Sequence, residues 1–205
     1  MDLRSLGETK RLSLRTPEEG ELESIVDLWT DVRAMEHTGG PREREVVETF
    51  FRETIADPEK LAREEGERWW SVLERSSGRW VGLCSLMDEA SGDQVATDGS
   101  IDAGLGYFLL PAFWGRGYAT EAAGRVLAYA FEDLGLKSVV AIVDPHNAGS
   151  AAVASKLGME VEREAKRADG VVRRVYRLWN PRSCTTEGPC RSVQYVGATA
   201  HRMRP

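Results

Sequence analysis

Residues 105–122 read Leu105-Gly106-Tyr107-Phe108-Leu109-Leu110-Pro111-Ala112-Phe113-Trp114-Gly115-Arg116-Gly117-Tyr118-Ala119-Thr120-Glu121-Ala122, and they join an apolar strand to a helix through a turn with two glycines. Gly115 and Gly117 let the backbone approach an anion closely, and the start of the helix offers unpaired N–H groups. Arg116 adds a positive charge and Thr120 adds a hydroxyl donor. Glycines between a strand and a helix are also compatible with a plain tight turn. The flanking sequence therefore has to decide between a turn and the anion site that this stretch predicts.

The sequence after the turn predicts a β-α-β unit. Apolar residues recur at three- and four-residue steps from Tyr118 to Leu134, which indicates an amphipathic helix that ends near Gly135. The β-branched run Val139–Val143 then indicates a buried strand. Strand, helix and strand in this order predict a right-handed parallel crossover.

Further elements are expected on both sides of this unit. The expected elements are a strand over 12–14, helices over 17–35 and 42–55, a hairpin over 69–87, a helix over 147–157, and strands over 160–166 and 171–179 joined at Asp169-Gly170. Trp69 and Trp70 alternate along a strand, so one is expected in the core and the other toward a pocket. Cys84 lies in an apolar run and is expected to be a small core residue.

Two motifs stand in this order along the chain, Trp114-Gly115-Arg116-Gly117-Tyr118-Ala119-Thr120-Glu121-Ala122 and Asn147-Ala148-Gly149-Ser150 followed by Lys156-Leu157-Gly158-Met159. Together they resemble the GCN5-related N-acetyltransferase (GNAT) superfamily, most closely its RimJ/RimL-type branch, which acetylates the N-terminal amines of ribosomal proteins. Arg11-Leu12-Ser13-Leu14-Arg15 and Trp80-Val81-Gly82-Leu83 also resemble the first and third strands of that branch.

The resemblance implies an α/β (α+β) fold, with a mixed, mostly antiparallel sheet flanked by helices and a central β-α-β core that binds acetyl-coenzyme A. It implies one acetyltransferase domain over residues 10–180, and residues 181–205 lose periodicity and are expected to form a disordered tail. The implied activity is direct transfer of the acetyl group of acetyl-coenzyme A to a primary amine, on a protein N-terminus or a small molecule. A non-catalytic acyl-coenzyme A sensor or binding module is the alternative.

The resemblance also assigns residues to the cofactor. In the superfamily the loop before the central helix holds the pyrophosphate of coenzyme A, and the preceding strand pairs with its pantetheine arm and polarises the thioester carbonyl. The residues expected to bind acetyl-coenzyme A are Phe108, Leu109, Leu110, Trp114, Gly115, Arg116, Gly117, Tyr118, Ala119, Thr120, Asn147, Ser150 and Lys156. Asn147 is equally well placed to be a plain helix cap, and the two roles are compatible.

Two departures from the superfamily pattern affect the expected mechanism. Many members carry a tyrosine after the asparagine as the acid that protonates the leaving thiolate, and this chain has Ala154 there. In the ribosomal-protein branch a serine at the position of Ser150 is a proposed substitute. Members of that branch also often carry a glutamate as general base before the Gly-Tyr pair, and this chain has Gly104.

The expected catalytic residues are therefore Asn147, Ser150 and Asp102. Asp102 precedes Gly104 on the same face of an extended strand and would act through water, although a solvated loop residue is the competing interpretation. Glu36 and His37 lie in the helical region that lines the acceptor site in relatives, so they are further candidates. His37 is equally compatible with an ordinary surface histidine.

Composition excludes some other classes of function. A net charge of -6 argues against a nucleic-acid partner, and the acidic run over 63–67 would favour a cationic acceptor amine if it lay near the pocket. No apolar run reaches the length of a membrane span and the N-terminal segment is polar, so no membrane partner and a cytoplasmic location are expected. The three cysteines show no metal-ligand spacing, so no metal is expected. The sequence neither predicts nor excludes a homodimer.

Overall fold

The structure is a computed structural model, and it describes residues 5–88, 103–166 and 170–182. Its described strands form one sheet in the order β1-β2-β3-β4-β5-β6-β8-β7. The strands are β1 (Ser5–Glu8), β2 (Leu12–Arg15), β3 (Glu67–Glu74), β4 (Trp80–Asp88), β5 (Ala103–Leu109), β6 (Ser138–Val143), β7 (Glu160–Lys166) and β8 (Val172–Trp179). Neighbouring strands are antiparallel except for β5 and β6, which are parallel. This arrangement confirms the mixed, mostly antiparallel sheet.

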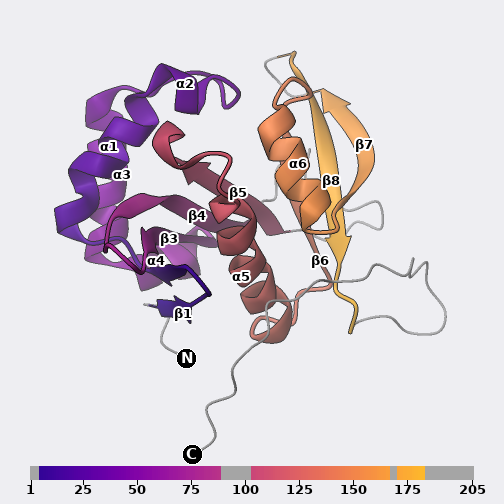
Figure 1. Ribbon diagram of the computed structural model, residues 1–205, viewed down its shortest axis with the longest axis horizontal. Coiled ribbons are helices and arrows are strands. Elements are labelled where there is room, and N and C mark those ends of the chain that lie inside the picture. The colour runs from indigo at the N-terminus through magenta and orange to yellow at the C-terminus, as the bar shows by residue number, and fades with distance from the viewer. Residues whose placement is uncertain (1–4, 89–102, 167–169, 183–205) are drawn as a thin grey trace, which may run out of the picture.

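The helices cover the sheet on both faces (Figure 1). They are α1 (Leu22–Thr30), α2 (Val32–Met35), α3 (Arg44–Ala56), α4 (Pro58–Glu64), α5 (Tyr118–Glu132) and α6 (Ala148–Lys156), with 3-10 turns η1 (Glu19–Glu21) and η2 (Pro111–Phe113). Helices α1 to α4 lie with the N-terminal strands on one side of the molecule, α6 lies with β7 and β8 on the other, and α5 runs between them.

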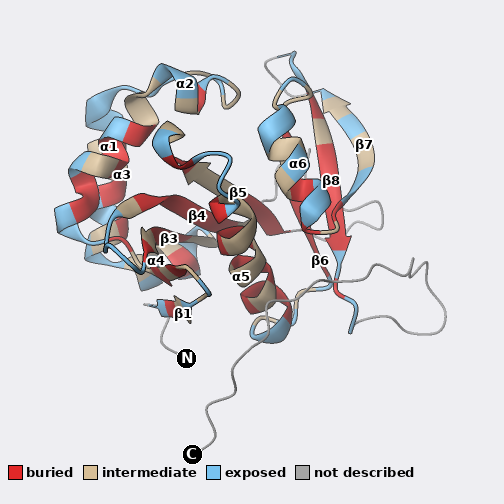
Figure 2. Cartoon of the chain, viewed as in Figure 1, coloured by how far each residue is buried: buried red, intermediate tan, exposed pale blue. Residues whose placement is uncertain are grey.

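Two hydrophobic cores hold these layers together. Helix α5 buries the stripe that its periodicity predicted, Ala122, Ala123, Val126, Leu127 and Ala130, each at 0% exposure, against the strands. A smaller cluster packs α1 and α3 against the opposite face. In Figure 2 the buried residues accordingly lie along the strands and on the inward sides of α1, α3 and α5.

The tryptophan pair of β3 contributes to both cores. Trp70 belongs to the core under α5 and meets Tyr129 edge to face, whereas Trp69 belongs to the α1–α3 cluster and packs against Trp29 and Phe108. Both are buried, so the expectation that one of them faces a pocket is wrong. Cys84 is buried as expected, and burial raises the pKa of its thiol to about 12.

Three local expectations need correction. The helix expected over 17–35 is interrupted at Asp31, whose backbone is extended and whose carboxylate caps α2 by accepting from the N–H groups of Arg33 and Ala34. Helix α4 and strand β1 lie outside the elements that the sequence predicts. Among the described residues, none of the helices combines the length and the apolar character needed to cross a membrane.

The parallel pair β5–β6 creates the main irregularity of the sheet. These strands pair at Ala103–Val139 and Gly104–Val140, and the pairing ends there although both strands continue. β5 stays paired with β4 up to Leu109, and β6 stays paired with β8 up to Val143. The sheet therefore splits between β5 and β6, and the facing edges of these two strands are not paired with each other beyond that point.

Candidate active site

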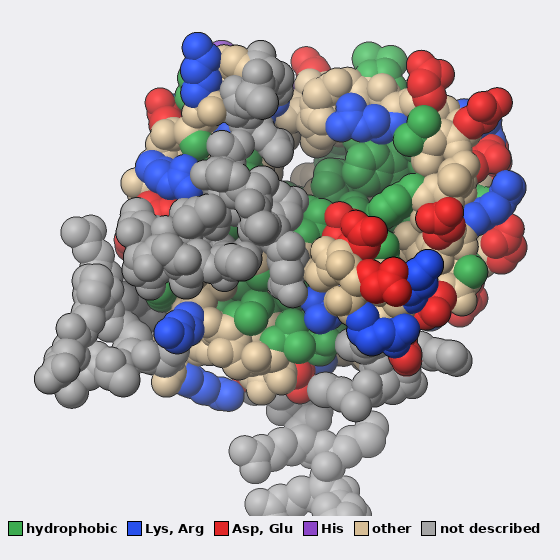
Figure 3. Space-filling model, turned by 180° about the vertical axis from the view of Figure 1, so that it is seen from behind, with side chains coloured by type: hydrophobic (Ala, Val, Ile, Leu, Met, Phe, Trp, Pro, Cys, Tyr) green, Lys and Arg blue, Asp and Glu red, His purple; other side chains and the backbone are tan. Residues whose placement is uncertain are grey.

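One cavity of about 1000 Å³ lies where β5 and β6 separate. Its walls are β5 from Gly104 to Leu109, the end of β6, the start of α5, one side of α6, and the segment from Arg33 to Arg42. Figure 3 shows the molecule hollowed on this face, with hydrophobic side chains along one wall and both basic and acidic side chains at the rim. The cavity thus joins the glycine-containing turn to the helical N-terminal region.

The glycine turn forms the end of the cavity at α5. Gly115 and Gly117 have φ angles of 73° and 77°, which side chains with a Cβ rarely adopt. Gly117 is the N-cap of α5, so the N–H groups of the next residues have no acceptor within the helix. Gly115, Gly117, Tyr118, Ala119 and Thr120 line the cavity. The predicted anion site is therefore open to a ligand.

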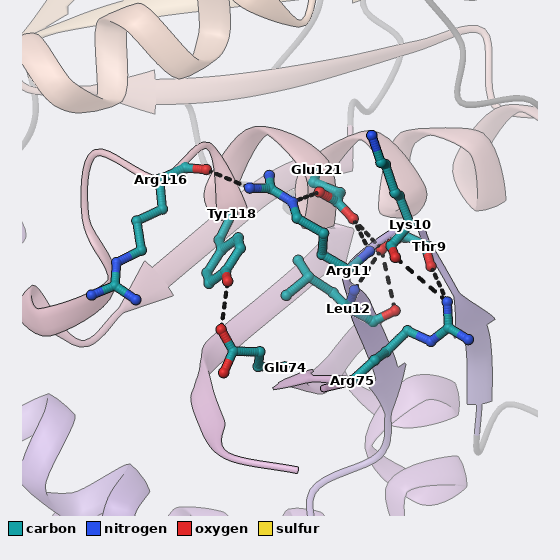
Figure 4. A network of polar contacts seen from close by, with 9 residues as sticks. All are labelled: Thr9, Lys10, Arg11, Leu12, Glu74, Arg75, Arg116, Tyr118 and Glu121. Carbon is teal, nitrogen blue, oxygen red and sulfur yellow. Dashed lines mark hydrogen bonds and ion pairs between the residues drawn. The ribbon is translucent and has the colours of Figure 1, made fainter. Parts of the chain in front are cut away.

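Arg11 lies in the turn between β1 and β2 and makes hydrogen bonds to the glycine loop and to α5 (Figure 4). Its Nη1 donates to the backbone oxygen of Arg116 at 2.8 Å, and its Nε donates to Glu121 at 2.7 Å. The same carboxylate accepts from the Arg11 backbone N–H at 2.7 Å and from the Thr9 hydroxyl at 2.6 Å. Burial raises the pKa of Glu121, but these hydrogen bonds outweigh it, so its pKa lies below the usual value.

Tyr118 makes a second connection from the start of α5. Its hydroxyl donates to Glu74 of β3 at 2.5 Å, and its ring lies under the Arg11 guanidinium at 4.6 Å. Glu74 also accepts hydrogen bonds from Ser77 and Arg79. The bonds from Ser77, Tyr118 and Arg79 lower the pKa of Glu74 to about 2. The loop is therefore attached to the β1–β2 turn and to β3, both of which are distant from it in sequence.

The start of α6 forms the wall opposite β5. The Asn147 side chain accepts from the backbone N–H of Ser150 at 2.9 Å, so Asn147 caps the helix as expected, and it also lines the cavity. The Tyr107 hydroxyl lies 2.8 Å from the Ser150 hydroxyl and donates to the Ser150 backbone oxygen at 3.1 Å. Burial raises the pKa of Tyr107 to about 12. Ala154, where many relatives carry a tyrosine, is fully buried in the core.

Most predicted cofactor residues come together around this cavity. Phe108, Leu109, Trp114, Gly115, Gly117, Tyr118, Ala119, Thr120, Asn147, Ser150 and Lys156 line it. Leu110 and Arg116 are not among the lining residues, and the Arg116 guanidinium lies over the Phe113 ring at 5.5 Å. Asp102 lies outside the residues that the structure describes. Sequence reasoning gave no role to Tyr107 or Arg11, although Tyr107 belongs to the stretch that predicts the fold.

The end of the cavity away from the glycine turn is formed by the segment after α2. Glu36 and His37, which the resemblance offers as acceptor-site candidates, both line the cavity there. His37 Nδ1 lies 4.0 Å from the Asp144 carboxylate at the end of β6, and that carboxylate pairs with Arg173 at 3.2 Å. Arg42 also lines this end. The acidic run over 63–67 is not among the lining residues, so it does not set the charge of the cavity.

Comparison with known proteins identifies the architecture. The family model of the acetyltransferase (GNAT) domain matches residues 11–160. The uncharacterized N-acetyltransferase p20 of Bacillus licheniformis is 25% identical over 173 residues, covering 82% of this chain and 91% of that protein. The structure of an acetyltransferase from Agrobacterium tumefaciens str. C58 is 28% identical with a TM-score of 0.67, covering 83% of this chain and 92% of the other.

Two further solved structures share the fold at lower identity. A ribosomal-protein-S5-alanine acetyltransferase from Vibrio fischeri is 17% identical with a TM-score of 0.65, covering 84% of this chain and 95% of the other. A spermidine N-acetyltransferase from Vibrio cholerae, in complex with CoA and spermine, is 19% identical with a TM-score of 0.65, covering 83% and 96%. The resemblance found in the two motifs is thus confirmed, and proteins of the ribosomal-protein branch are among the structural neighbours.

Proposed function

The chain belongs to the acetyltransferase (GNAT) family, and we propose that it transfers the acetyl group of acetyl-coenzyme A to a primary amine by direct attack. The observation that carries this proposal is the single cavity of about 1000 Å³ that reaches from the glycine turn to the segment after α2. A volume of this size is at the upper end for small-ligand sites, which suits a long cosubstrate together with an acceptor.

In this proposal the start of α5 holds the phosphates of the cosubstrate. The N–H groups after Gly117 and the positive end of the helix dipole provide an anion site that needs no particular side chain. Lys156 lines the cavity and adds a positive charge. Arg116 contributes through its backbone conformation, because its side chain is not among the lining residues and its carbonyl is held by Arg11.

The edge of β5 then binds the remainder of the cosubstrate. In an antiparallel strand alternate residues direct their N–H and C=O groups to opposite sides, so the side of β5 away from β4 presents groups that β6 does not pair once it has separated. Among them, the Leu109 oxygen accepts from the Trp114 indole N–H at 2.8 Å. These groups match the amides of an extended pantetheine arm. A backbone N–H aimed at the thioester oxygen would stabilise the negative charge that develops there during acyl transfer.

Direct attack fits the polar groups in the cavity better than a covalent intermediate does. A serine nucleophile needs an adjacent base. The described partners of Ser150 are the Tyr107 hydroxyl and the Asn147 side chain, neither of which is a base at neutral pH. We therefore propose that Ser150 interacts with the departing thiolate, and that Asn147 caps the start of α6 and so fixes its shape.

Charge at the acceptor end guides the choice among amines. Arg33, Arg42 and Arg173 line the cavity there, against the carboxylates of Glu36 and Asp144. Arg42 reaches the backbone oxygens of Thr38 and Gly40, which are neutral partners. Arg173 pairs with Asp144 and Arg33 lies 3.9 Å from Asp31, so a polyamine would bring its positive charges close to Arg42, whose described partners are neutral. An N-terminal or small-molecule amine with a neutral or anionic remainder is therefore the acceptor we expect.

A second candidate function is a non-catalytic acyl-coenzyme A sensor. Gly104 and Ala154, where the superfamily pattern has acid–base residues, favour it. The two functions differ in turnover and agree in cofactor binding, so one experiment with two readouts separates them.

The experiment measures acetyl-coenzyme A binding by calorimetry and its consumption with pooled amines, with products identified by mass spectrometry. The pool contains peptides with neutral, acidic and basic N-termini, amino acids, polyamines and aminoglycosides. An acetylated product supports the transferase and identifies the acceptor. Tight binding with no product from any pool supports the sensor, and no binding refutes both.

A further inference from the structure

Tyr107 and Ser150 join two walls of the cavity through their hydroxyl groups, and we propose that Tyr107 orients the Ser150 hydroxyl so that it donates to the departing thiolate of coenzyme A. Ser150 faces the sulfur, and Tyr107 is a positioning residue that acts through Ser150. This inference rests on the proposed acetyl transfer and adds a residue to it. In this proposal the Tyr107–Ser150 pair takes the role of the tyrosine that many relatives carry at the position of Ala154.

The geometry of the pair is the first support. Tyr107 lies on β5, and Ser150 lies in the first turn of α6, so the contact crosses the split between β5 and β6. The two hydroxyl oxygens are 2.8 Å apart, and the Tyr107 oxygen is 3.1 Å from the Ser150 backbone oxygen. Both residues line the cavity. The Ser150 backbone is itself fixed, because its N–H donates to the Asn147 cap at 2.9 Å.

The number of protons in the pair restricts its arrangements. Tyr107 has one hydroxyl proton, which it donates either to the Ser150 backbone oxygen or to the Ser150 hydroxyl. When the serine hydroxyl receives it, the serine's own proton is free to point into the cavity. A thiolate in the cavity favours this second arrangement, because a hydrogen bond to a charged acceptor is stronger than one to a neutral acceptor.

The environment of Tyr107 keeps it in the donor form. Burial raises its pKa to about 12, so the hydroxyl carries its proton throughout the neutral range. The buried Ala154 leaves the core side of α6 without a hydroxyl at that position, whereas Tyr107 delivers one to the same helix from the opposite wall. The hydroxyl that orients Ser150 therefore comes from β5, whereas Ser150 itself lies on α6.

The step balances as follows. The amine nitrogen forms a bond to the acetyl carbon, the carbon–sulfur bond breaks, and its electron pair goes to sulfur. Ser150 donates a hydrogen bond to the sulfur as its negative charge develops, and Tyr107 holds the serine hydroxyl in that orientation. The proton that the attacking amine loses passes to water, and water protonates the thiolate.

The test uses three variants of the full chain, Tyr107→Phe, Ser150→Ala and the double variant. Ser155→Ala is the control, since Ser155 is an exposed serine on the same helix and is not among the cavity-lining residues. For the wild type and for each variant we measure kcat and KM for acetyl-coenzyme A. We also measure the pKa of the thiol of bound coenzyme A, which is followed through the ultraviolet absorbance of the thiolate. Thermal unfolding verifies that each variant is folded.

We expect Tyr107→Phe to lower kcat about 10- to 100-fold, toward the lower range of acid–base contributions, with KM for acetyl-coenzyme A changed less than about 2-fold. The double variant should be no slower than Ser150→Ala, because both residues serve one step. In the wild type the bound thiol should have a lower pKa than free coenzyme A, since donors favour the thiolate, and Tyr107→Phe should return it toward the free value. Ser155→Ala should match the wild type in every measurement.

Two results would overturn the proposal. If the loss of kcat in the double variant equals the product of the losses in the two single variants, the residues act in separate steps. A thiol pKa that is the same in the wild type and in Tyr107→Phe would show that the pair does not contact the sulfur. The second readout needs no turnover, so it distinguishes a failure of this inference from a failure of the proposed acetyl transfer.

Discussion

At the end of the cavity that we propose binds the phosphates, Arg11 and Tyr118 attach the glycine loop to the β1–β2 turn and to β3 by hydrogen bonds of 2.5 to 2.8 Å. At the proposed acceptor end, His37 approaches Asp144 only to 4.0 Å, and the Arg42 guanidinium reaches the carbonyls of its own loop. Contacts at the first end span 44 to 110 residues of sequence, whereas the contacts of the Arg42 guanidinium span 2 to 4. One end is therefore fixed by the whole fold, and the other is built locally.

This difference follows from what each end has to bind in the proposed function. The cosubstrate is the same whatever the acceptor, so a rigid phosphate end can serve every reaction that the fold supports. The segment after α2 contains Gly39 and Gly40 at φ angles of 93° and 89° and is closed by local hydrogen bonds such as Gly40 N–H to Met35 O at 3.0 Å. A locally built segment can change its shape and charge with little effect on the loop at α5.

The sharpest test of the fixed end is Gly117→Val. A β-branched residue at a φ of 77° is strained, so the loop has to leave this backbone conformation or bear the strain, whereas the added Cβ would make only an ordinary contact of 3.4 Å with Arg11 Nη2. We expect the affinity for acetyl-coenzyme A to fall at least about 100-fold, which corresponds to roughly 2.7 kcal/mol. Calorimetry measures this directly.

Gly135→Val is the matched control for this experiment. Gly135 has a φ of 66° beyond the opposite end of α5, and a Cβ there would meet nothing within 4 Å. It should lower the thermal midpoint through backbone strain and leave cofactor affinity unchanged. Equal affinity losses in the two variants would mean that global destabilisation, and not the loop, controls binding.

Arg11→Lys tests the next largest effect. Lysine keeps the charge but lacks the guanidinium that bonds Arg116 O and Glu121 at once, so the loop loses one of its two fixed supports. We expect coenzyme A to bind about 10-fold more weakly, with a higher KM for acetyl-coenzyme A and a nearly unchanged kcat.

Arg75→Lys is the control for Arg11→Lys. Arg75 bonds the same β1–β2 turn, to Thr9 O at 3.0 Å and Glu8 at 2.6 Å, and its described contacts do not include the loop at α5. Its replacement should leave coenzyme A affinity within about 2-fold of the wild type, since exposed ion pairs contribute little. A loss that equals that of Arg11→Lys would show that charge near the turn, and not the contact with the loop, matters.

Acid titration addresses the Tyr118–Glu74 connection. The pKa of Glu74 falls to about 2 in the folded protein, below its ordinary value of 4.5, because Ser77, Tyr118 and Arg79 donate to it. A depressed folded-state pKa gives stability that is complete above pH 4.5 and is lost as the pH falls toward 2. In a series of thermal unfolding midpoints, Glu74→Gln should therefore lose less stability than the wild type over this range. Parallel curves would contradict the assignment.

Much of the fold is predictable because its signals are local. The helical spacing after Gly117, the β-branched run of β6 and the Asn147 cap all act within one element, and the structure has each of them. Helix α4 had a local signal too, since Asp57 caps it by accepting from Lys60 N–H at 2.9 Å and Pro58 follows at the first turn. The charged composition of that stretch concealed it.

The support of the site is harder to predict because it consists of long-range contacts. Arg11 reaches Arg116 across 105 residues, and Tyr107 reaches Ser150 across 43. No periodicity in the chain connects these positions, so only the folded sheet and its split bring them together. A motif identifies the loop at α5, but it does not indicate which strand holds that loop or which wall supplies a hydroxyl.

The smallest expected effect belongs to His37→Gln at the acceptor end. Glutamine keeps a polar side chain near Asp144, and the 4.0 Å approach of His37 is too long for a hydrogen bond, so little stability should be lost. Coenzyme A affinity should stay within about 2-fold of the wild type, because His37 contacts none of the groups that hold the loop. If His37 serves the acceptor, its KM or the pH dependence of kcat/KM will change while the cofactor parameters do not. A loss of coenzyme A affinity comparable with that of Arg11→Lys would mean that the two ends of the cavity are coupled, and the contrast between a fixed end and a locally built end would fail.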